Sequence, residues 1–209
     1  METFWGLSFL LQVEFNFLKN CFNKMKLFDI QTFRKKSTSI IIGHKYSGKS
    51  ELCKYFLRNL HFISGSILTK NKSTYNEIQT CNFISVLEKI PEEGFFILDN
   101  SFDEDWISNP IIKKIFLHGG DLNLTTFLSM VHPYHIHPVL RYNIDYAFLL
   151  KTHNHATRKR LFEMYGGIFS TYNCFNDYMD KLEDYECLVI DLQSFKPLEE
   201  SVFLLRHNL

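Results

Sequence analysis

A complete phosphate-binding motif near the start of the chain limits the folds that the sequence can adopt. The pattern G-x-x-x-x-G-K-S is formed by Gly43, His44, Lys45, Tyr46, Ser47, Gly48, Lys49 and Ser50. A short apolar run rich in isoleucine, residues 39–42, precedes the motif, and apolar residues recur at helical spacing in residues 51–57 after it. Strand, glycine-rich loop and helix in this order are the context in which the motif binds nucleotide phosphates.

The residue types of the motif indicate its chemistry. Gly43 and Gly48 let the backbone turn so that successive N–H groups point toward phosphate oxygens. The helix that follows presents the positive end of its dipole to the same anion. We expect Lys49 to reach the β- and γ-phosphates and the Ser50 hydroxyl to ligate Mg²⁺. The sequence therefore predicts ATP and Mg²⁺ as the cofactors of this site.

The rest of the chain alternates apolar segments typical of strands with segments of helical spacing. We expect strands at residues 65–68, 94–100, 124–130, 144–150, 187–191 and 202–205. We expect a loop at residues 69–74 and helices at residues 83–89, 111–116 and 155–182, the last one broken at Gly166 and Gly167. This alternation predicts an α/β fold, a three-layer sandwich around a mainly parallel sheet, with ligands at the carboxyl ends of the strands.

Composition sets further bounds. The 209 residues suit one domain with a sizeable core, which we place at residues 25–209, after an apolar extension at residues 1–24 without an assigned role. The longest uncharged stretch of that extension is too short to span a membrane, so we expect no transmembrane anchor. The 23 basic residues balance 23 acidic ones, which excludes a global basic signature for nucleic acid. Five cysteines without a C-x-x-C pair indicate reduced thiols in a cytosolic compartment.

A second acid is expected to complete the nucleotide site. Asp99 ends an apolar strand 50 residues after Lys49, where P-loop ATPases place the aspartate that organises Mg²⁺; an ordinary strand-end cap is the alternative. The next residue is Asn100, which can orient a water molecule but cannot accept its proton. A nearby acidic stretch could substitute for a base or could be a solvated turn: Asp103, Glu104 and Asp105.

Two clusters of ionisable residues allow both a functional and a structural interpretation. The histidines lie around two prolines, without a nearby cysteine, which favours an irregular loop over a metal site; they are His132, His135 and His137. The basic run could be a solvated helix face or a contact to DNA phosphates; it consists of Arg158, Lys159 and Arg160.

Three later segments resemble one family. Residues 138–146 read P-x-x-R-x-N-x-D-Y, residues 160–169 contain arginine-leucine, tyrosine-glycine-glycine and phenylalanine, and residues 185–191 form a closing apolar strand that ends in aspartate. Together with the glycine loop and the Asp99 strand, they are similar to the genome-packaging ATPases of large nucleocytoplasmic DNA viruses, such as those of poxviruses and iridoviruses. These enzymes belong to the FtsK–HerA class of P-loop motors, and the resemblance covers roughly residues 26–205.

The resemblance implies an ATP-driven motor that moves viral double-stranded DNA into a preformed shell. Such motors act as homo-oligomeric rings, commonly hexamers, with ATP at subunit interfaces. Capsid or portal proteins would be partners, and the protein would work at assembly sites in the host cytoplasm or in the virion. Lys49, Ser50 and Asp99 would keep the family's nucleotide roles. Arg141 would sense the γ-phosphate or stabilise transition-state charge, with a structural salt bridge to Asp145 or a neighbour as the alternative.

The chain departs from the family pattern at three polar positions. Asn100 replaces a second acid, Gly120 stands where the family often has an arginine, and the polar sensor falls near Val131 or His132. These departures favour a second hypothesis, a nucleotide-binding structural subunit with little or no hydrolysis. A small-molecule kinase is a third hypothesis, but it would need a basic lid, for which residues 158–160 are the available candidate.

Overall fold

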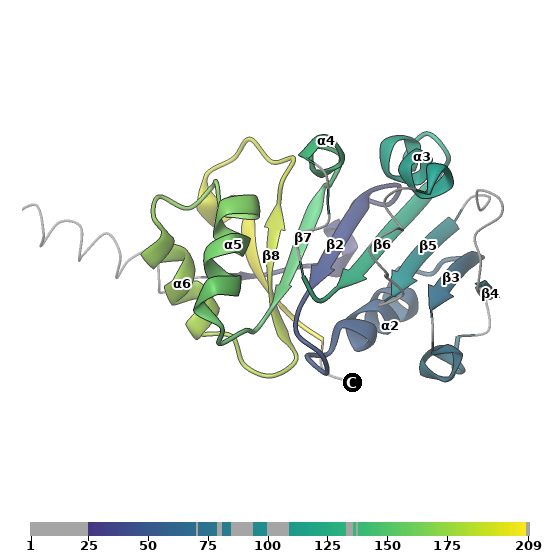
Figure 1. Ribbon diagram of the computed structural model, residues 1–209, viewed down its shortest axis with the longest axis horizontal. Coiled ribbons are helices and arrows are strands. Elements are labelled where there is room, and N and C mark those ends of the chain that lie inside the picture. Colours follow the sequence, from purple (N-terminus) through teal and green to yellow (C-terminus); the bar gives the residue numbers. More distant parts are fainter. Residues whose placement is uncertain are drawn as a thin grey trace, which may run out of the picture.

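The chain folds around a mixed, mainly parallel sheet with helices on both faces (Figure 1). The computed structural model describes residues 25–69, 71–78, 81–84, 94–99, 109–132, 136 and 138–207. Nine strands in these ranges follow the order β1-β9-β8-β7-β2-β6-β5-β3-β4. All neighbouring strands pair in parallel except that β8 is antiparallel to both β7 and β9. The predicted three-layer α/β fold with a mainly parallel sheet is confirmed.

The bounds of the elements are as follows. The strands are β1 Lys26–Leu27, β2 Thr38–Ile42, β3 Gly65–Thr69, β4 Cys81–Ile84, β5 Gly94–Asp99, β6 Leu124–Met130, β7 Tyr146–Leu150, β8 Glu186–Asp191 and β9 Val202–Arg206. The helices are α2 Lys49–Asn59, α3 Pro110–His118, α4 Pro138–Arg141, α5 His155–Tyr165 and α6 Tyr172–Asp180. Short 3-10 turns occupy Ile30–Thr32, Lys72–Tyr75 and Leu198–Glu200.

The two faces of the sheet bury separate apolar clusters. On one face, α2 packs Leu52 and Phe56 against strand residues such as Phe127. On the other face, α3, α5 and α6 pack against the sheet, and α5 contributes Leu161. The central strands β2, β5, β6 and β7 are buried almost throughout, because a parallel sheet covered on both faces requires near-continuous apolar runs.

Two expectations about local structure were wrong. Thr69 ends β3 and residues Lys72–Tyr75 form a 3-10 turn, in a stretch that we expected to be loop. Residues 83 and 84 were expected to begin a helix, but they belong to β4, which pairs with β3 along its whole length. The pairing with a neighbouring strand overrides the local apolar spacing. Residues 85–89 and the extension at residues 1–24 lie outside the described ranges.

Candidate nucleotide-binding site

The phosphate-binding motif forms the connection between β2 and α2. The N–H of Gly43 donates to the carbonyl of Met130 at the end of β6 (3.2 Å), which fixes the start of the loop against the neighbouring strand. Gly48 adopts a left-handed φ of 96° immediately before α2, and its carbonyl accepts the N–H of Leu52. A side chain at Gly43 would lie 2.3 Å from Ser47 Oγ. The loop geometry therefore requires glycine at position 48, and a larger residue at position 43 would displace the Ser47 hydroxyl.

Lys49 lies inside the loop. Its ammonium donates to the carbonyls of Gly43 (2.9 Å) and His44 (2.8 Å), and the residue is only 3% exposed. Burial lowers the pKa of Lys49, and the nearby charge of Asp99 opposes that shift. The loop thus holds a desolvated positive charge at the N-terminus of a helix, which is the arrangement that binds phosphate.

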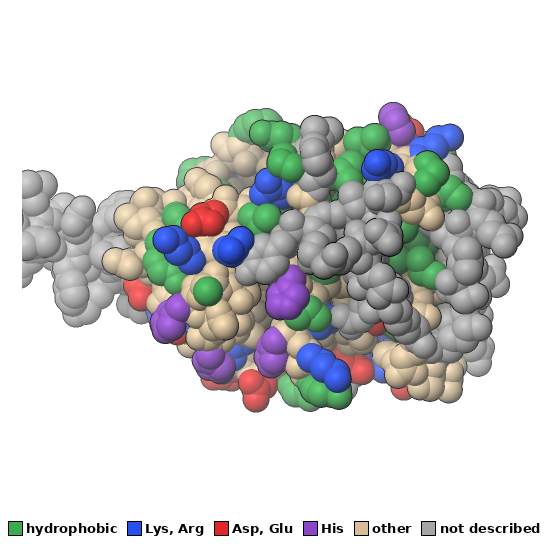
Figure 2. Space-filling view, in the orientation of Figure 1, with side chains coloured by type: hydrophobic (Ala, Val, Ile, Leu, Met, Phe, Trp, Pro, Cys, Tyr) green, Lys and Arg blue, Asp and Glu red, His purple; other side chains and the backbone are tan. Residues whose placement is uncertain are grey.

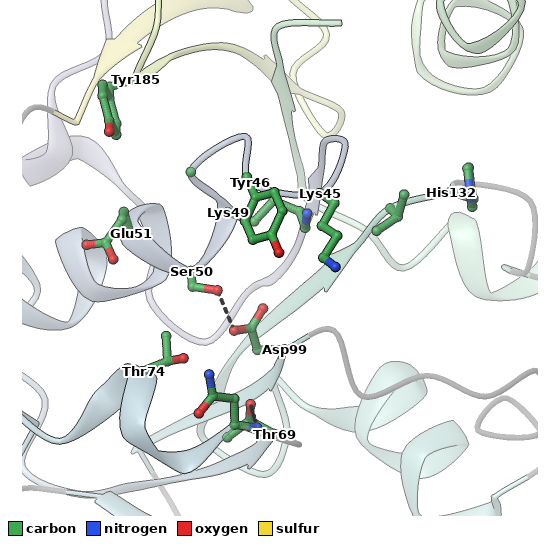
Figure 3. A pocket seen from close by; sticks show the side chains of 13 residues that line it. Lys45, Tyr46, Lys49, Ser50, Glu51, Thr69, Thr74, Asp99, His132 and Tyr185 are labelled. Atoms are coloured by element: carbon green, nitrogen blue, oxygen red, sulfur yellow. Dashed lines mark hydrogen bonds between the residues drawn. The ribbon is translucent and has the colours of Figure 1, made fainter.

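Ser50 and Asp99 meet as the sequence predicted. The Ser50 hydroxyl donates to Asp99 Oδ2 at 2.7 Å (Figure 3). Asp99 is the last residue of β5 and is 3% exposed. Hydroxyl and carboxylate oxygens are ligands that Mg²⁺ prefers, so this pair fits a magnesium ion held directly or through water. Asn100 and the acidic residues 103–105 lie outside the described residues.

Tyr75 is a member of the site that sequence reasoning missed. Its hydroxyl donates to the same Asp99 oxygen at 2.8 Å, and its side chain is fully buried. Burial, together with the nearby Cys53 and Asp99, raises the pKa of Tyr75 well above its ordinary value, so the phenol remains a donor. Tyr75 stands 24 residues before Asp99 in a polar segment, and no local pattern in the sequence marks it.

We expect Tyr75→Phe to lower the free energy of unfolding by ~2 kcal/mol, because it removes one of the donors that hold a buried carboxylate. The Mg²⁺ concentration needed for half-maximal ATP binding should rise, since Asp99 loses its fixed orientation. Denaturant titration and calorimetric ATP binding at varied Mg²⁺ would measure both effects. Tyr55→Phe makes the same chemical change at a half-buried position of α2 and is the matched control. Wild-type behaviour of Tyr75→Phe in both measurements would show that Tyr75 does not position Asp99.

A pocket of about 860 Å³ extends along the loop. Figure 3 shows Tyr185 and Glu51 on one side of Ser50 and His132 on the other. Val131 and His132, the positions expected for a polar sensor, line this pocket beside Asp99. A pocket of this size suits a nucleotide. His135 and His137 lie outside the described residues, within which no three His, Cys, Asp or Glu side chains are grouped closely enough to hold a metal.

Arg141 lies far from the loop of its own chain. It ends α4 just before β7 begins, whereas the loop follows the carboxyl end of β2, and these two strands are parallel neighbours. Figure 1 shows α4 and the start of α2 at opposite ends of the sheet. The alternative, a structural salt bridge to Asp145 or a neighbour, is not found within the described residues, where Asp145 accepts the N–H of Thr38. Arg141 lines a separate pocket of about 460 Å³.

The basic run divides into a buried residue and two exposed ones. Arg158 is fully buried: its Nε donates to the Thr152 carbonyl and its guanidinium pairs with Asp180 at 2.6 Å. The hypothesis that Arg158 contacts DNA was therefore wrong, because the residue ties α5 to α6. Lys159 and Arg160 are exposed. On the face that carries these helices, basic and acidic side chains are interspersed (Figure 2).

Comparisons of the sequence with known proteins identify relatives in large DNA viruses. No protein-family model matches the chain. An uncharacterized protein of Acanthamoeba polyphaga mimivirus is 34% identical over 106 residues, which cover 49% of this chain and 37% of the relative. An uncharacterized protein of Invertebrate iridescent virus 6 is 25% identical over 181 residues, covering 74% and 70% respectively. The chain thus spans little more than a third of the first of these relatives.

Solved structures share the fold. The genome packaging NTPase B204 of Sulfolobus turreted icosahedral virus 2, solved with sulfate, has a TM-score of 0.64 at 17% identity and covers 85% of this chain and 99% of that one. EssC of Geobacillus thermodenitrificans, containing ATPases 2 and 3, has a TM-score of 0.53 at 10% identity, over 75% of this chain and 38% of that one. The fold and the loop together define an α/β domain of the P-loop NTPase type. Its sequence relatives are proteins of large DNA viruses.

Proposed function

We propose that this protein is an ATP-hydrolysing motor of the FtsK–HerA class that moves double-stranded viral DNA into a capsid during virion assembly. The observation that carries the proposal is the grouping of the buried Lys49 and Asp99 with the half-buried Ser50 around one pocket. The likeness of the fold, over 85% of this chain, to a viral genome packaging NTPase supports it. The viral origin of the relatives agrees with a place at assembly sites in the host cytoplasm or in the virion.

The reaction would be attack of water on the γ-phosphate in line with the bond to the leaving ADP. The loop N–H groups and the Lys49 ammonium would bind the phosphate oxygens and offset the charge that develops on them. Ser50 and Asp99 would hold Mg²⁺, which when bound neutralises charge on the β- and γ-phosphates. His132 lines the same pocket, on the side of Ser50 away from Tyr185, and would orient the attacking water.

Ring assembly would give Arg141 a role in the neighbouring active site. The residue lies at the end of the sheet opposite its own loop, and head-to-tail packing in a ring brings different surfaces of adjacent subunits together. We propose that Arg141 acts there as an arginine finger. Substitution of Arg141 therefore tests both the assembly of subunits into a ring and the stabilisation of the transition state.

Arg141→Ala should lower turnover by roughly 10³-fold, the lower end for an arginine finger, with ATP binding almost unchanged. Mixing this variant with Lys49→Ala subunits should restore part of the activity, because each variant supplies the group that the other lacks. Arg58→Ala, which breaks the exposed ion pair between Arg58 on α2 and Glu77, is the matched control. If mixing restores nothing and Arg141→Ala turns over normally, the interface role is wrong.

DNA movement itself requires a separate assay. The full chain, with Mg²⁺ and ATP, should displace a triplex-forming strand from a double-stranded DNA track, and Lys49→Ala should not. If the protein binds DNA and hydrolyses ATP but does not displace the triplex-forming strand, the result would argue against translocation. The alternative function is a nucleotide-binding structural subunit, which Asn100 in place of a second acid favours. It predicts ATP binding without ATP hydrolysis and without DNA translocation.

A further inference from the structure

Tyr185 forms the wall of the nucleotide pocket at the end away from Asp99. It immediately precedes β8, lines the pocket together with Glu51 and Gly48, and is 48% exposed. Figure 3 shows it well separated from the Ser50–Asp99 pair. The role of this residue is not explained by phosphate or metal binding, since its side chain offers an aromatic face rather than a charge.

The polarity of the pocket indicates which part of a nucleotide would meet Tyr185. The terminal phosphates belong with the Lys49 ammonium and with the oxygens of Ser50 and Asp99. A nucleoside attached to those phosphates must therefore extend out of the loop away from Asp99. Glu51 and Tyr185 line that side, and the Glu51 carboxylate is paired with Lys54 at 2.8 Å. Tyr46 also lines the pocket but lies beside Lys49, so Tyr185 presents the aromatic surface for a base on the side away from Asp99.

The backbone around Tyr185 is fixed to the loop through His207. Tyr185 has a left-handed φ of 62°, and its carbonyl accepts the N–H of His207 at 3.1 Å. The two rings meet edge to face with centroids 6.0 Å apart. His207 is fully buried and lies against Gly48, where a Cβ would come within 3.2 Å of its Nε2. The phosphate loop and the aromatic wall are thus parts of one packed unit.

Two physical features support a functional interpretation of this unit. A tyrosine in the left-handed region is strained, and such strain is concentrated at ligand sites. Burial lowers the pKa of His207 to about 4, so the ring that supports Tyr185 is neutral at physiological pH. Asparagine or glycine would adopt the same backbone at position 185 with less strain.

We propose that the base of the bound nucleotide stacks on Tyr185, with His207 as the residue that positions it. The inference depends on the proposed ATP site. Stacking on an aromatic ring is worth ~1–3 kcal/mol per base, or roughly 5- to 150-fold in affinity, and tolerates any base. The site would accordingly prefer nucleoside triphosphates over inorganic triphosphate and discriminate little between ATP and GTP.

The test compares calorimetric binding of Mg·ATP and of inorganic triphosphate to the full chain. Tyr185→Asn suits the left-handed backbone, so it should fold while weakening ATP binding roughly 10-fold and leaving triphosphate binding unchanged. Tyr185→Phe keeps the ring and should bind both as wild type does. His207→Ala should lower the ratio of ATP to triphosphate affinity, and His207→Phe should restore it.

Each outcome decides between the proposals. Unchanged ATP binding by Tyr185→Asn, or equal losses for ATP and triphosphate, would overturn the stacking role while leaving the ATP site in place. Failure of the wild-type protein to bind either ligand would instead overturn the proposed function, and the stacking role with it. Thermal unfolding of each variant confirms that the comparison is made between folded proteins.

Discussion

Lys49→Ala is expected to reduce ATP turnover at least ~100-fold and to weaken ATP binding strongly, while the protein remains folded. The Lys49 ammonium lies inside the loop, bonded to the carbonyls of Gly43 and His44, at the position that the terminal phosphates require. Its removal leaves phosphate charge without a desolvated counter-charge. Stability should change little, because burial of this ammonium already opposes its charged form, as its lowered pKa shows.

Lys45→Ala provides the matched control for this prediction. It lies in the same loop and carries the same charge, but it is exposed and its ammonium lies over the ring of Tyr46. Calorimetric ATP binding, steady-state hydrolysis and thermal unfolding should be measured on both variants. If the two substitutions reduce binding equally, the loop attracts phosphate by general charge only, and the specific role assigned to Lys49 is wrong.

Phe56→Ala is expected to lower the free energy of unfolding by ~3–5 kcal/mol. The Phe56 ring on α2 is fully buried and stacks on Phe127 with centroids 4.8 Å apart, and it meets Phe148 edge to face at 4.9 Å. A loss of this size is a large part of the total stability of a domain, which is ~5–15 kcal/mol. Since α2 also carries Lys49 and Ser50, the nucleotide site should loosen together with the core.

Phe195→Ala makes the same chemical change at a fully exposed position. Its effect on unfolding should stay within ~0.5 kcal/mol. Denaturant titrations of both variants and the wild type, with and without Mg·ATP, would measure the difference. A cost below ~1 kcal/mol for Phe56→Ala would contradict the aromatic core described for this face of the sheet.

The phosphate-binding loop and the central sheet could be predicted because their signals are local. The apolar runs of β2, β5 and β6 reflect burial on both faces of the sheet. The glycine motif, placed between a strand and a helix, predicts the backbone of a phosphate-binding loop. Even the meeting of Ser50 with Asp99 follows from topology, because parallel strands bring their carboxyl ends to one edge of the sheet.

Residues whose roles depend on distant contacts could not be predicted. Tyr75 reaches Asp99 from a polar turn, and His207 reaches Gly48 from the end of the last strand. Arg158 is indistinguishable in sequence from Arg160, yet the partner carboxylate of Asp180 on α6 makes it a buried structural residue. Strand β4 likewise owes its conformation to pairing with β3 rather than to its own spacing.

The decisive experiment is steady-state ATP hydrolysis by the full chain with and without double-stranded DNA, together with Lys49→Ala and Asn100→Asp. A packaging motor predicts turnover that DNA stimulates and that Lys49→Ala abolishes. Tight ATP binding without turnover at any DNA concentration would contradict it. Recovery of hydrolysis in Asn100→Asp would then identify the chain as a nucleotide-binding subunit that lacks its catalytic base.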